Sequence, residues 1–551
     1  MKTISSIIAG CACILSLSMC KQGVATTADY NVVPRPALIV ENGSLSPFTL
    51  STKSIIGYPE DNAELKKQAE LLADYIFDQT GIRIGVAPAA GDIRLTSDLD
   101  AENPEAYVMT VGADGILING ASAAGTFYGV QTLRNSIPAV DADQVVLPAA
   151  EIRDEPRFAY RGAHLDVCRH FFPMDSVKKF VDLMAMHKLN NFHFHITEDQ
   201  GWRWEVKSHP ELTTIGAHRD GTVIGRNTSE YDSIPVDGFY TQDELRDLVQ
   251  YAADRQINII PEIDLPGHMQ AALAAYPNLG CTGGPYEVWK RWGISKDVLC
   301  AGNDSTYEFL KDVFAELVDI FPSEIIHIGG DECPKDRWKE CPKCQAKAKA
   351  LGLRTDASGT REAKLQNHVM TYVSDFLHEK GRRVIGWDEI LDADFDENAI
   401  IMSWRGEEGG IAGATRGHDV VMTPNQYLYF DYYQTTDKDN EPLAIGGYVP
   451  LEKVYNYEPV PAVLTDEQQK HIIGVQANLW TEYIPTFEQA QYMELPRMAA
   501  LSEIQWTDGK SKDYEDFKMR LMPMMQRYDR LGYRYSTRAF DDADQQSAPA
   551  E

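Results

Sequence analysis

The feature that most constrains the fold is an alternation of short apolar runs with helical stretches, which begins near Arg157 and continues to about residue 508. Runs of this length fit buried strands, and the intervening stretches repeat apolar residues at a helical period. We expect strands at residues 161–166, 191–196, 257–262, 325–329, 384–387, 400–404, 420–423 and 473–479. We expect helices between them, including 174–187, 241–255, 306–321 and 361–380. Eight strands that alternate with helices predict a (β/α)8 TIM barrel of the α/β class.

The chain ahead of the barrel has a mixed pattern that predicts a small α+β domain. Residues 64–79 place apolar side chains on one helical face, and Ser122 is a plausible N-cap for a second helix. Asp114-Gly115 lies between two apolar stretches, which is a strong hairpin signal. The predicted organisation is a signal peptide at 1–20, the α+β domain at 29–155, the barrel at 157–508, and a C-terminal helix and tail at 509–551.

The first twenty residues resemble an export signal. Lys2 is followed by an apolar run that is too short to span a bilayer comfortably, and the run ends at Cys20. Residues 17–20 resemble a bacterial lipoprotein cleavage site, although Met19 is bulkier than the residue usual there. Cleavage before Cys11 and plain secretion without a lipid are the alternatives. We expect an exported protein, in the periplasm or at the cell surface, that is lipid-anchored through Cys20.

The charge balance excludes one class of partner. Asp and Glu total 82 against 52 Lys and Arg, a formal net charge of −30. Such a surface repels phosphate backbones, so we expect no nucleic acid partner. The chain also shows no glycine-rich phosphate loop and no serine nucleophile elbow.

Cysteine spacing favours disulfides or free thiols over a metal. Cys281 and Cys300 bracket a loop-like segment, and we expect them to pair, because export permits disulfides. Cys333, Cys341 and Cys344 form C-x7-C-x2-C. A structural zinc site needs four ligands, and no nearby histidine supplies the fourth. We therefore expect no metal ion and no cofactor.

Acids, histidines and tryptophans gather where the predicted strands end. In a barrel these carboxyl ends line the active site, whereas ends built only for packing would favour aliphatic residues and glycine. The first strand region contributes Arg161, Asp166, Arg169 and His170. The other strand ends contribute His193, His195, Glu198, Asp199, Glu262, Asp264, His268, Asp331, Glu332, Trp387, Asp388, Glu389, Trp404, Tyr429, Asp431, Trp480 and Glu482.

Paired carboxylates beside several tryptophans indicate a sugar site. Acid-catalysed cleavage of a glycoside needs a carboxylic acid that stays protonated near neutral pH, and burial next to another carboxylate has that effect. Tryptophan faces suit the C–H faces of a pyranose or a methyl group. The predicted function is therefore glycoside hydrolysis.

These residues resemble a known family, the β-N-acetylhexosaminidases of glycoside hydrolase family 20, over about residues 30 to 508. The most specific feature is the adjacent pair Asp331-Glu332 after His327-Ile328-Gly329-Gly330. The other matching blocks are Arg161-Gly162 to Leu165-Asp166 with Arg169-His170-Phe171-Phe172, Glu198-Asp199-Gln200-Gly201-Trp202-Arg203, Pro261-Glu262-Ile263-Asp264-Leu265-Pro266-Gly267-His268 and Trp480-Thr481-Glu482.

The resemblance implies an exo-acting, retaining enzyme that releases terminal β-linked GlcNAc or GalNAc from glycans. In this mechanism the acetamido oxygen of the substrate is the nucleophile and an oxazolinium ion is the intermediate. Glu332 would be the acid and later the base, and Asp331 would orient the acetamido group and stabilise the positive charge. Asp199 and His268 would support the acid.

The resemblance also assigns the substrate contacts. Arg161 would clamp sugar hydroxyls, and Tyr429 would donate to the acetamido oxygen. The remaining contacts would be walls of the acetamido pocket and partners of the outer hydroxyls: Trp387, Trp404 and Trp480 for the walls, Asp431 and Glu482 for the hydroxyls.

Two other functions remain as alternatives. A binding-only descendant would keep the pocket but lose the acid pair, and both acids are present. A retaining glycosidase with a protein nucleophile would place its two acids on separate strands, about 5 Å apart, and Glu262 with Glu332 is such a pair.

Overall fold

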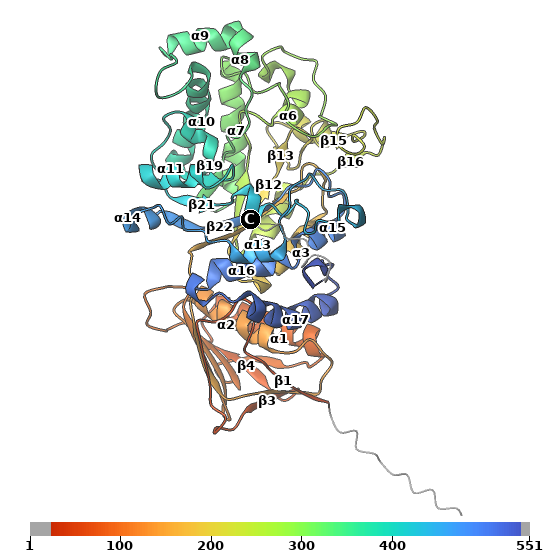
Figure 1. Cartoon of the computed structure of the whole chain (residues 1–551), viewed down its shortest axis with the longest axis vertical. Helices are drawn as coiled ribbons and strands as arrows, with labels where there is room; N and C mark the ends of the chain where they lie inside the picture. The colour runs from red at the N-terminus through yellow and green to blue at the C-terminus, as the bar shows by residue number, and fades with distance from the viewer. Residues whose placement is uncertain (1–23, 541–551) are drawn as a thin grey trace, which may run out of the picture.

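The structure, a computed structural model, describes residues 24–540. The predicted signal peptide, Cys20 and the tail beyond Phe540 lie outside the described residues. Figure 1 shows a domain of strands at one end, the barrel in the middle, and α8 (Asp336–Glu340) and α9 (Pro342–Ala350) at the opposite end.

The barrel is closed by eight parallel strands, which confirms the predicted (β/α)8 fold. Its strands are adjacent in the order in which they occur along the chain, and the last pairs with the first. They are β11 (Tyr160–Asp166), β12 (Asn191–His195), β17 (Asn258–Glu262), β18 (Ile325–His327), β19 (Arg383–Trp387), β20 (Ile400–Ser403), β21 (Val420–Met422) and β22 (Ile472–Leu479). Each coincides with a predicted strand to within a few residues.

The predicted barrel helices are also present, and polar caps define where several of them begin. Thr241 and Glu244 form a capping box at the start of one helix, and Asn303 and Thr360 accept backbone N–H groups at the start of two others. The main helices of the barrel domain are α3 (Met174–Met186), α5 (Gln242–Ala253), α7 (Asp304–Ile320), α10 (Arg361–Glu379), α11 (Glu408–Arg416), α15 (Phe487–Glu494) and α16 (Arg497–Trp506).

Several connections after the strands are long and carry short elements of their own. Those after β12, β17 and β18 extend beyond the barrel on the side away from the N-terminal domain (Figure 1). Besides α8 and α9 these elements are β13 (Thr197–Glu198), β14 (Gly201–Trp202), α4 (Glu211–Thr214), β15 (His218–Arg219), β16 (Val236–Asp237), α6 (Gln270–Ala275), η1 (Pro277–Leu279), η2 (Asp388–Asp392), α12 (Asn425–Leu428), η3 (Lys438–Asn440), α13 (Leu451–Asn456) and α14 (Asp466–Gln469).

The N-terminal domain contains a seven-stranded sheet, a three-stranded sheet and two helices. The larger sheet has the order β2-β10-β7-β8-β6-β4-β5 and the smaller the order β1-β9-β3. The expected hairpin is present, with Gly112 opposite Gly115. The elements are β1 (Ala25–Thr27), β2 (Leu38–Glu41), β3 (Phe48–Ser51), β4 (Ile55–Tyr58), α1 (Ala63–Thr80), β5 (Gly85–Pro88), β6 (Ile93–Thr96), β7 (Tyr107–Gly112), β8 (Gly115–Gly120), α2 (Ala123–Ser136), β9 (Gln144–Leu147) and β10 (Ala150–Asp154).

The two domains share a buried, polar interface. The predicted C-terminal helix is α17 (Tyr514–Leu531), which follows η4 (Gly509–Ser511), precedes η5 (Arg538–Phe540) and lies between α1 and the barrel (Figure 1). Lys188 of the barrel domain pairs with Asp154 at 2.9 Å, and both side chains are fully buried. Among the helices of residues 24–540, none combines the length and apolarity that crossing a bilayer requires.

Candidate active site

The carboxyl ends of the barrel strands bring the predicted acid pair next to one histidine. Asp331 and Glu332 follow β18, and His268 follows β17. The His268 Nε2 atom is 3.7 Å from an oxygen of Asp331 and 3.7 Å from an oxygen of Glu332. His268 is almost fully buried, whereas the Glu332 side chain is 37% exposed and so opens toward solvent. One imidazole thus contacts both acids.

The backbone around the acid pair is held in an unusual conformation. Glu332 has φ +43° and His268 has φ +52°, in the left-handed region that side chains other than glycine seldom adopt. Gly329, at φ +63°, passes so close to Asp264 that a β-carbon there would lie 1.8 Å from its carboxylate oxygen. Such strain persists only where the surroundings impose it, and it clusters at functional sites.

The environment favours a protonated Glu332. Burial raises the pKa of Glu332 above its usual value, and the neighbouring Asp331 carboxylate raises it further. Burial also raises the pKa of Asp264 well above normal, together with the charge of Asp331. We therefore place a proton on Asp264, which leaves the charge of that pair on Asp331. The raised pKa of Glu332 suits a proton donor, and the proton placed on Asp264 favours a charged Asp331 beside it.

Buried carboxylates hold His268 in place from behind. Its Nδ1 atom is 2.7 Å from Glu198 and 3.6 Å from Asp199. Burial alone would lower the pKa of His268, but the charge of Glu198 and the other facing carboxylates raises it well above normal. Asp199 accepts backbone N–H groups from Gln270 and Ser295, and burial followed by Glu198 raises its pKa to about 6.

The predicted aromatic residues form one continuous wall beside the acids. The ring centroids of Trp387 and Trp480 are 5.9 Å apart, and those of Tyr429 and Trp480 are 6.4 Å apart. Trp404 stacks on Tyr429 at 6.1 Å and donates its indole N–H to Glu389 at 2.9 Å. Three tryptophans and one tyrosine from four strand ends therefore line one apolar surface with a phenolic hydroxyl in it.

Unpartnered polar atoms point to a ligand with several hydroxyl groups. Both carboxylate oxygens of Asp431, one of Glu482 and one of Asp331 are buried and have no hydrogen-bond partner within residues 24–540. Buried polar atoms are normally satisfied, and unsatisfied ones at a cleft await a ligand or water.

Comparisons with known proteins agree with this geometry. The family model for the catalytic domain of glycosyl hydrolase family 20 matches residues 158–509, and the model for domain 2 of the same family matches residues 29–155. Together the two models match most of the chain. The chain belongs to glycosyl hydrolase family 20.

Individual relatives share both domains of the family 20 chain. A beta-hexosaminidase of Porphyromonas gingivalis is 43% identical over 541 residues, which cover 95% of this chain and 67% of the relative. The GH20 beta-N-acetylhexosaminidase structure from Streptomyces coelicolor has a TM-score of 0.79 at 31% identity and covers 92% and 97% of the two chains. A Vibrio harveyi GH20 exo beta-N-acetylglucosaminidase in complex with N-acetylglucosamine has a TM-score of 0.81 at 32% identity, with 93% and 79% covered.

The prediction for Arg161 is wrong, because this family 20 chain uses Arg161 at the opposite end of the barrel. Arg161 stands near the start of β11, is 1% exposed, and forms two hydrogen bonds of 2.7 and 2.9 Å to Glu105 of the N-terminal domain. It also donates to the carbonyls of Phe158 and Lys188. Each nitrogen of the Arg161 guanidinium therefore donates a hydrogen bond at the amino end of the barrel, away from the acid pair.

Arg169, just beyond the end of β11, is the arginine at the site. Its guanidinium is 3.2 Å from Asp166, 3.2 Å from Glu198 and 4.0 Å from Glu482, and it lies 5.0 Å from the centroid of Trp480. Arg169 and Asp264 both appeared at predicted strand ends without an assigned role. Their positions directly after predicted strands were the sequence signal that placed both residues near the site.

Glu262 cannot act as a nucleophile in this arrangement. It is fully buried, and its oxygens accept hydrogen bonds from Trp387 at 2.9 Å and His193 at 2.9 Å and also contact His195 and His327. The positive charge shared among these histidines lowers its pKa well below normal, in spite of burial. A carboxylate enclosed in this way cannot reach an anomeric carbon, which argues against the alternative of a Glu262–Glu332 pair.

Proposed function

We propose that this family 20 glycoside hydrolase is an exo-acting, retaining β-N-acetylhexosaminidase that releases terminal β-linked GlcNAc or GalNAc by substrate-assisted catalysis. The observation that carries the proposal is the adjacency of Asp331 and Glu332 around one His268 nitrogen. Acids on consecutive residues that share one histidine contact suit an acid and a stabiliser better than an acid and an opposing nucleophile.

In the first step the substrate forms its own intermediate. The acetamido carbonyl oxygen attacks C1, the bond from C1 to the leaving oxygen breaks, and Glu332 gives its proton to that oxygen. The product is a bicyclic oxazolinium ion. Its positive charge is spread over the acetamido group. There the Asp331 carboxylate accepts a hydrogen bond from the N–H and stabilises the charge. The Tyr429 hydroxyl donates to the acetamido oxygen.

In the second step water opens the ring from the face that the aglycone has left. Glu332, now ionised, takes a proton from the water as its oxygen attacks C1, and the acetamido group returns to its starting form. Two inversions at C1 give net retention. Glu332 ends protonated, so the cycle closes without any other proton donor.

The aromatic wall and the unpartnered acids select the sugar. Trp387, Trp404 and Trp480 enclose the acetamido methyl, which is the apolar part of the substrate. Asp431 and Glu482 accept hydrogen bonds from the outer hydroxyl groups. They do so with the oxygens that have no partner in the described chain. Arg169 holds Glu482 in position. The similar V. harveyi enzyme bound to N-acetylglucosamine supports this sugar class.

A matched substrate pair tests the mechanism. Hydrolysis of an aryl β-N-acetylglucosaminide should be fast, and the aryl β-glucoside should be nearly inert because it lacks both the nucleophile and the group that fills the pocket. A pre-formed thiazoline resembles the cyclic intermediate and should inhibit strongly. Comparable rates on the two sugars, or indifference to the thiazoline, would refute substrate assistance and favour a protein nucleophile.

We also propose that the enzyme is exported and anchored by a lipid on Cys20. The support is the basic start, the short apolar run and the cysteine at its end. Cys20→Ala should move the enzyme from the membrane fraction to the soluble exported fraction with unchanged specific activity. Retention of the variant in membranes would contradict the anchor.

A further inference from the structure

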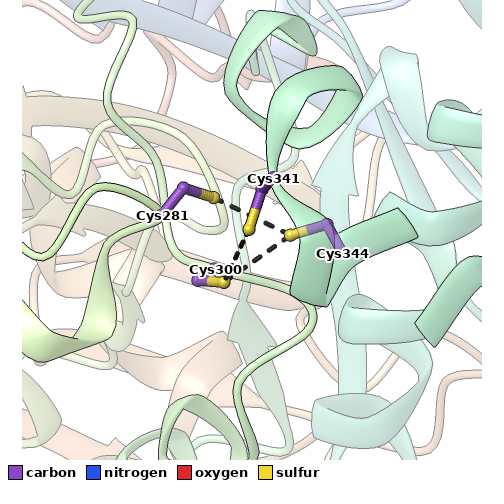
Figure 2. A group of neighbouring side chains, drawn as sticks. All are labelled: Cys281, Cys300, Cys341 and Cys344. Carbon is purple, nitrogen blue, oxygen red and sulfur yellow. Dashed lines mark hydrogen bonds between the residues drawn. The ribbon is translucent and has the colours of Figure 1, made fainter. Parts of the chain in front are cut away.

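Four cysteines from separate segments converge beside the active-site loops. Cys281 and Cys300 lie in the long connection after β17, Cys341 stands between α8 and α9, and Cys344 lies in the first turn of α9 (Figure 2). All four sulfurs lie within 4.8 Å of one another, and three of the cysteines are buried. The fifth candidate, Cys333, lies outside this cluster.

The cluster differs from the sequence expectation in two ways. Cys281 and Cys300 are free thiols and do not form the expected disulfide. The sequence pattern grouped Cys341 and Cys344 with Cys333 and offered no fourth ligand, whereas the structure places Cys281 and Cys300 beside them. Folding supplies these ligands from 41 to 63 residues away, a distance along the chain at which spacing motifs carry no signal.

The distances fit a tetrahedral metal site. The Sγ atoms are 3.7 Å apart for Cys281 and Cys344, 3.6 Å for Cys300 and Cys344, and 3.8 Å for Cys300 and Cys341. Four thiolates at the zinc–sulfur bond length of about 2.3 Å occupy a tetrahedron whose edges are about 3.8 Å. A disulfide would bring two sulfurs to about 2.05 Å.

The backbone at the cluster is built for close approach. A β-carbon on Gly302 would lie 2.1 Å from the Lys343 carbonyl carbon and 2.3 Å from the Cys344 nitrogen. Only glycine therefore lets the loop that carries Cys300 pass against the start of α9. The contact brings the two segments together at the cysteines, and no side chain larger than that of glycine fits at position 302.

We propose that Cys281, Cys300, Cys341 and Cys344 bind one Zn²⁺ ion in a structural tetrathiolate site. Binding releases the four thiol protons to solvent and leaves the metal and its four sulfurs with a net charge of −2. No thiol is oxidised. Because four protein sulfurs complete the coordination, no position remains for water or substrate, and the metal takes no part in hydrolysis.

The ion would join the two loops that support the acid pair. The connection that carries Cys300 donates the Ser295 backbone N–H to Asp199 at 3.1 Å and the Leu299 N–H to the Pro266 carbonyl at 3.0 Å. The segment that carries Cys341 follows directly from Glu332. Arg337 in that segment already pairs with Asp297 of the connection at 2.7 Å. The metal would complete this link between the loops.

Metal analysis and intact mass of the purified, folded enzyme test the proposal. We expect one zinc per chain by elemental analysis, and after unfolding with a chelator a mass equal to that of the fully reduced chain. An enzyme without metal would overturn the proposal, whether its mass is lighter by the hydrogens lost in disulfides or equal to that of the free thiols.

Cobalt substitution and a matched pair of variants test the ligand set. Co²⁺-loaded enzyme should show the sulfur-to-metal charge-transfer absorption and the visible bands of tetrahedral tetrathiolate coordination. Cys344→Ser should lose zinc and these bands, and Cys333→Ser, a buried cysteine outside the cluster, should keep both. Equal zinc content in the two variants would refute the assignment. If Cys344→Ser does not fold, the cobalt spectrum of the parent enzyme still decides the geometry.

Discussion

At the scale of single residues, Glu332 combines a strained backbone with an environment that raises the pKa of its carboxyl group. Its φ of +43° directs the side chain toward the opening while His268 contacts it from behind. The strain lies in the backbone of the site, at Glu332 and His268, and not in the Glu332 carboxyl group. Substitution of Glu332 should therefore alter chemistry more than folding.

Glu332→Gln should lower turnover of substrates with poor leaving groups by about 10²–10⁴-fold, the usual worth of general acid catalysis. Aryl glycosides with acidic phenols should lose less, because their leaving oxygen needs little protonation. Rates on both substrate types and an unchanged circular dichroism spectrum would establish the effect. Full activity of the variant on a natural glycan would remove Glu332 as the acid.

The same group should set the alkaline limb of the pH profile. The acid must be protonated to work, so kcat/KM should fall as the pH rises through the pKa of Glu332, which burial and Asp331 raise above its usual value. The limb should disappear in Glu332→Gln. A limb that survives in the variant would belong to another group.

Variants of the two arginines at the ends of β11 should have different effects, one on stability and the other on activity. Arg161→Gln leaves Glu105 without its partner in the domain interface, so we expect about 3–5 kcal/mol less free energy of unfolding and an unchanged kcat/KM. Arg169→Gln removes the 4.0 Å ion pair with Glu482 at the sugar, so we expect kcat/KM to fall by about tenfold or more, a change of about 1.4 kcal/mol.

Denaturant unfolding and steady-state kinetics on both variants provide the comparison. The reverse pattern, in which Arg161→Gln retains its stability and loses kcat/KM, would restore Arg161 as the sugar clamp. The barrel rule itself separates the two residues, since Arg161 stands near the amino end of its strand and Arg169 follows the carboxyl end.

At the scale of elements, α15 ends in a buried acid that has no partner. Glu494 is 1% exposed, and neither carboxylate oxygen has a hydrogen-bond partner in the described part of the chain. Burial raises its pKa to about 8, and Arg497 opposes that shift only in part. The folded state thus holds a proton that the unfolded chain releases at a lower pH.

This shift predicts a pH-dependent gain from Glu494→Gln. Between the unfolded pKa near 4.3 and the folded pKa near 8, the stability of the parent enzyme falls as the pH rises, because only the folded state retains the proton. The variant should match the parent near pH 5 and be more stable by about 3–4 kcal/mol near pH 8. Glu488→Gln, an exposed position on the same helix, is the control and should show no such pH dependence.

The elements were predictable from sequence to different extents. The barrel strands are buried apolar runs of typical length, so periodicity located all eight of them. The short pair β13 and β14 and the helices α8 and α9 were not expected, because their positions depend on tertiary contacts such as that of Trp338 with the Leu299 carbonyl. The cysteine cluster depends on the same loop contacts, and that is why its ligand set could not be read from spacing.

At the scale of the whole molecule, the net charge of −30 should affect which substrates approach. A sulfated aryl N-acetylglucosaminide should therefore have a kcat/KM that rises with added salt, since salt screens repulsion beyond about 10 Å at 0.1 M.

The neutral aryl N-acetylglucosaminide is the control for this prediction, and its kcat/KM should change little over the same range of salt. A steric effect of the sulfate group would lower the rate equally at every salt concentration. A sulfated substrate whose rate falls with salt would indicate a local cationic site that outweighs the overall charge.

The position of α17 has a consequence for the order in which the protein can be completed. Arg527 of this helix donates to the carbonyl of Ile137 at 2.8 Å, a residue made 390 positions earlier. Arg520 donates to the Val32 carbonyl at 3.0 Å and pairs with Glu503 at 2.7 Å. The first domain is synthesised early, yet the helix that joins it to the barrel emerges only after the whole barrel. A nascent chain therefore exposes an unfinished junction until α17 has left the ribosome.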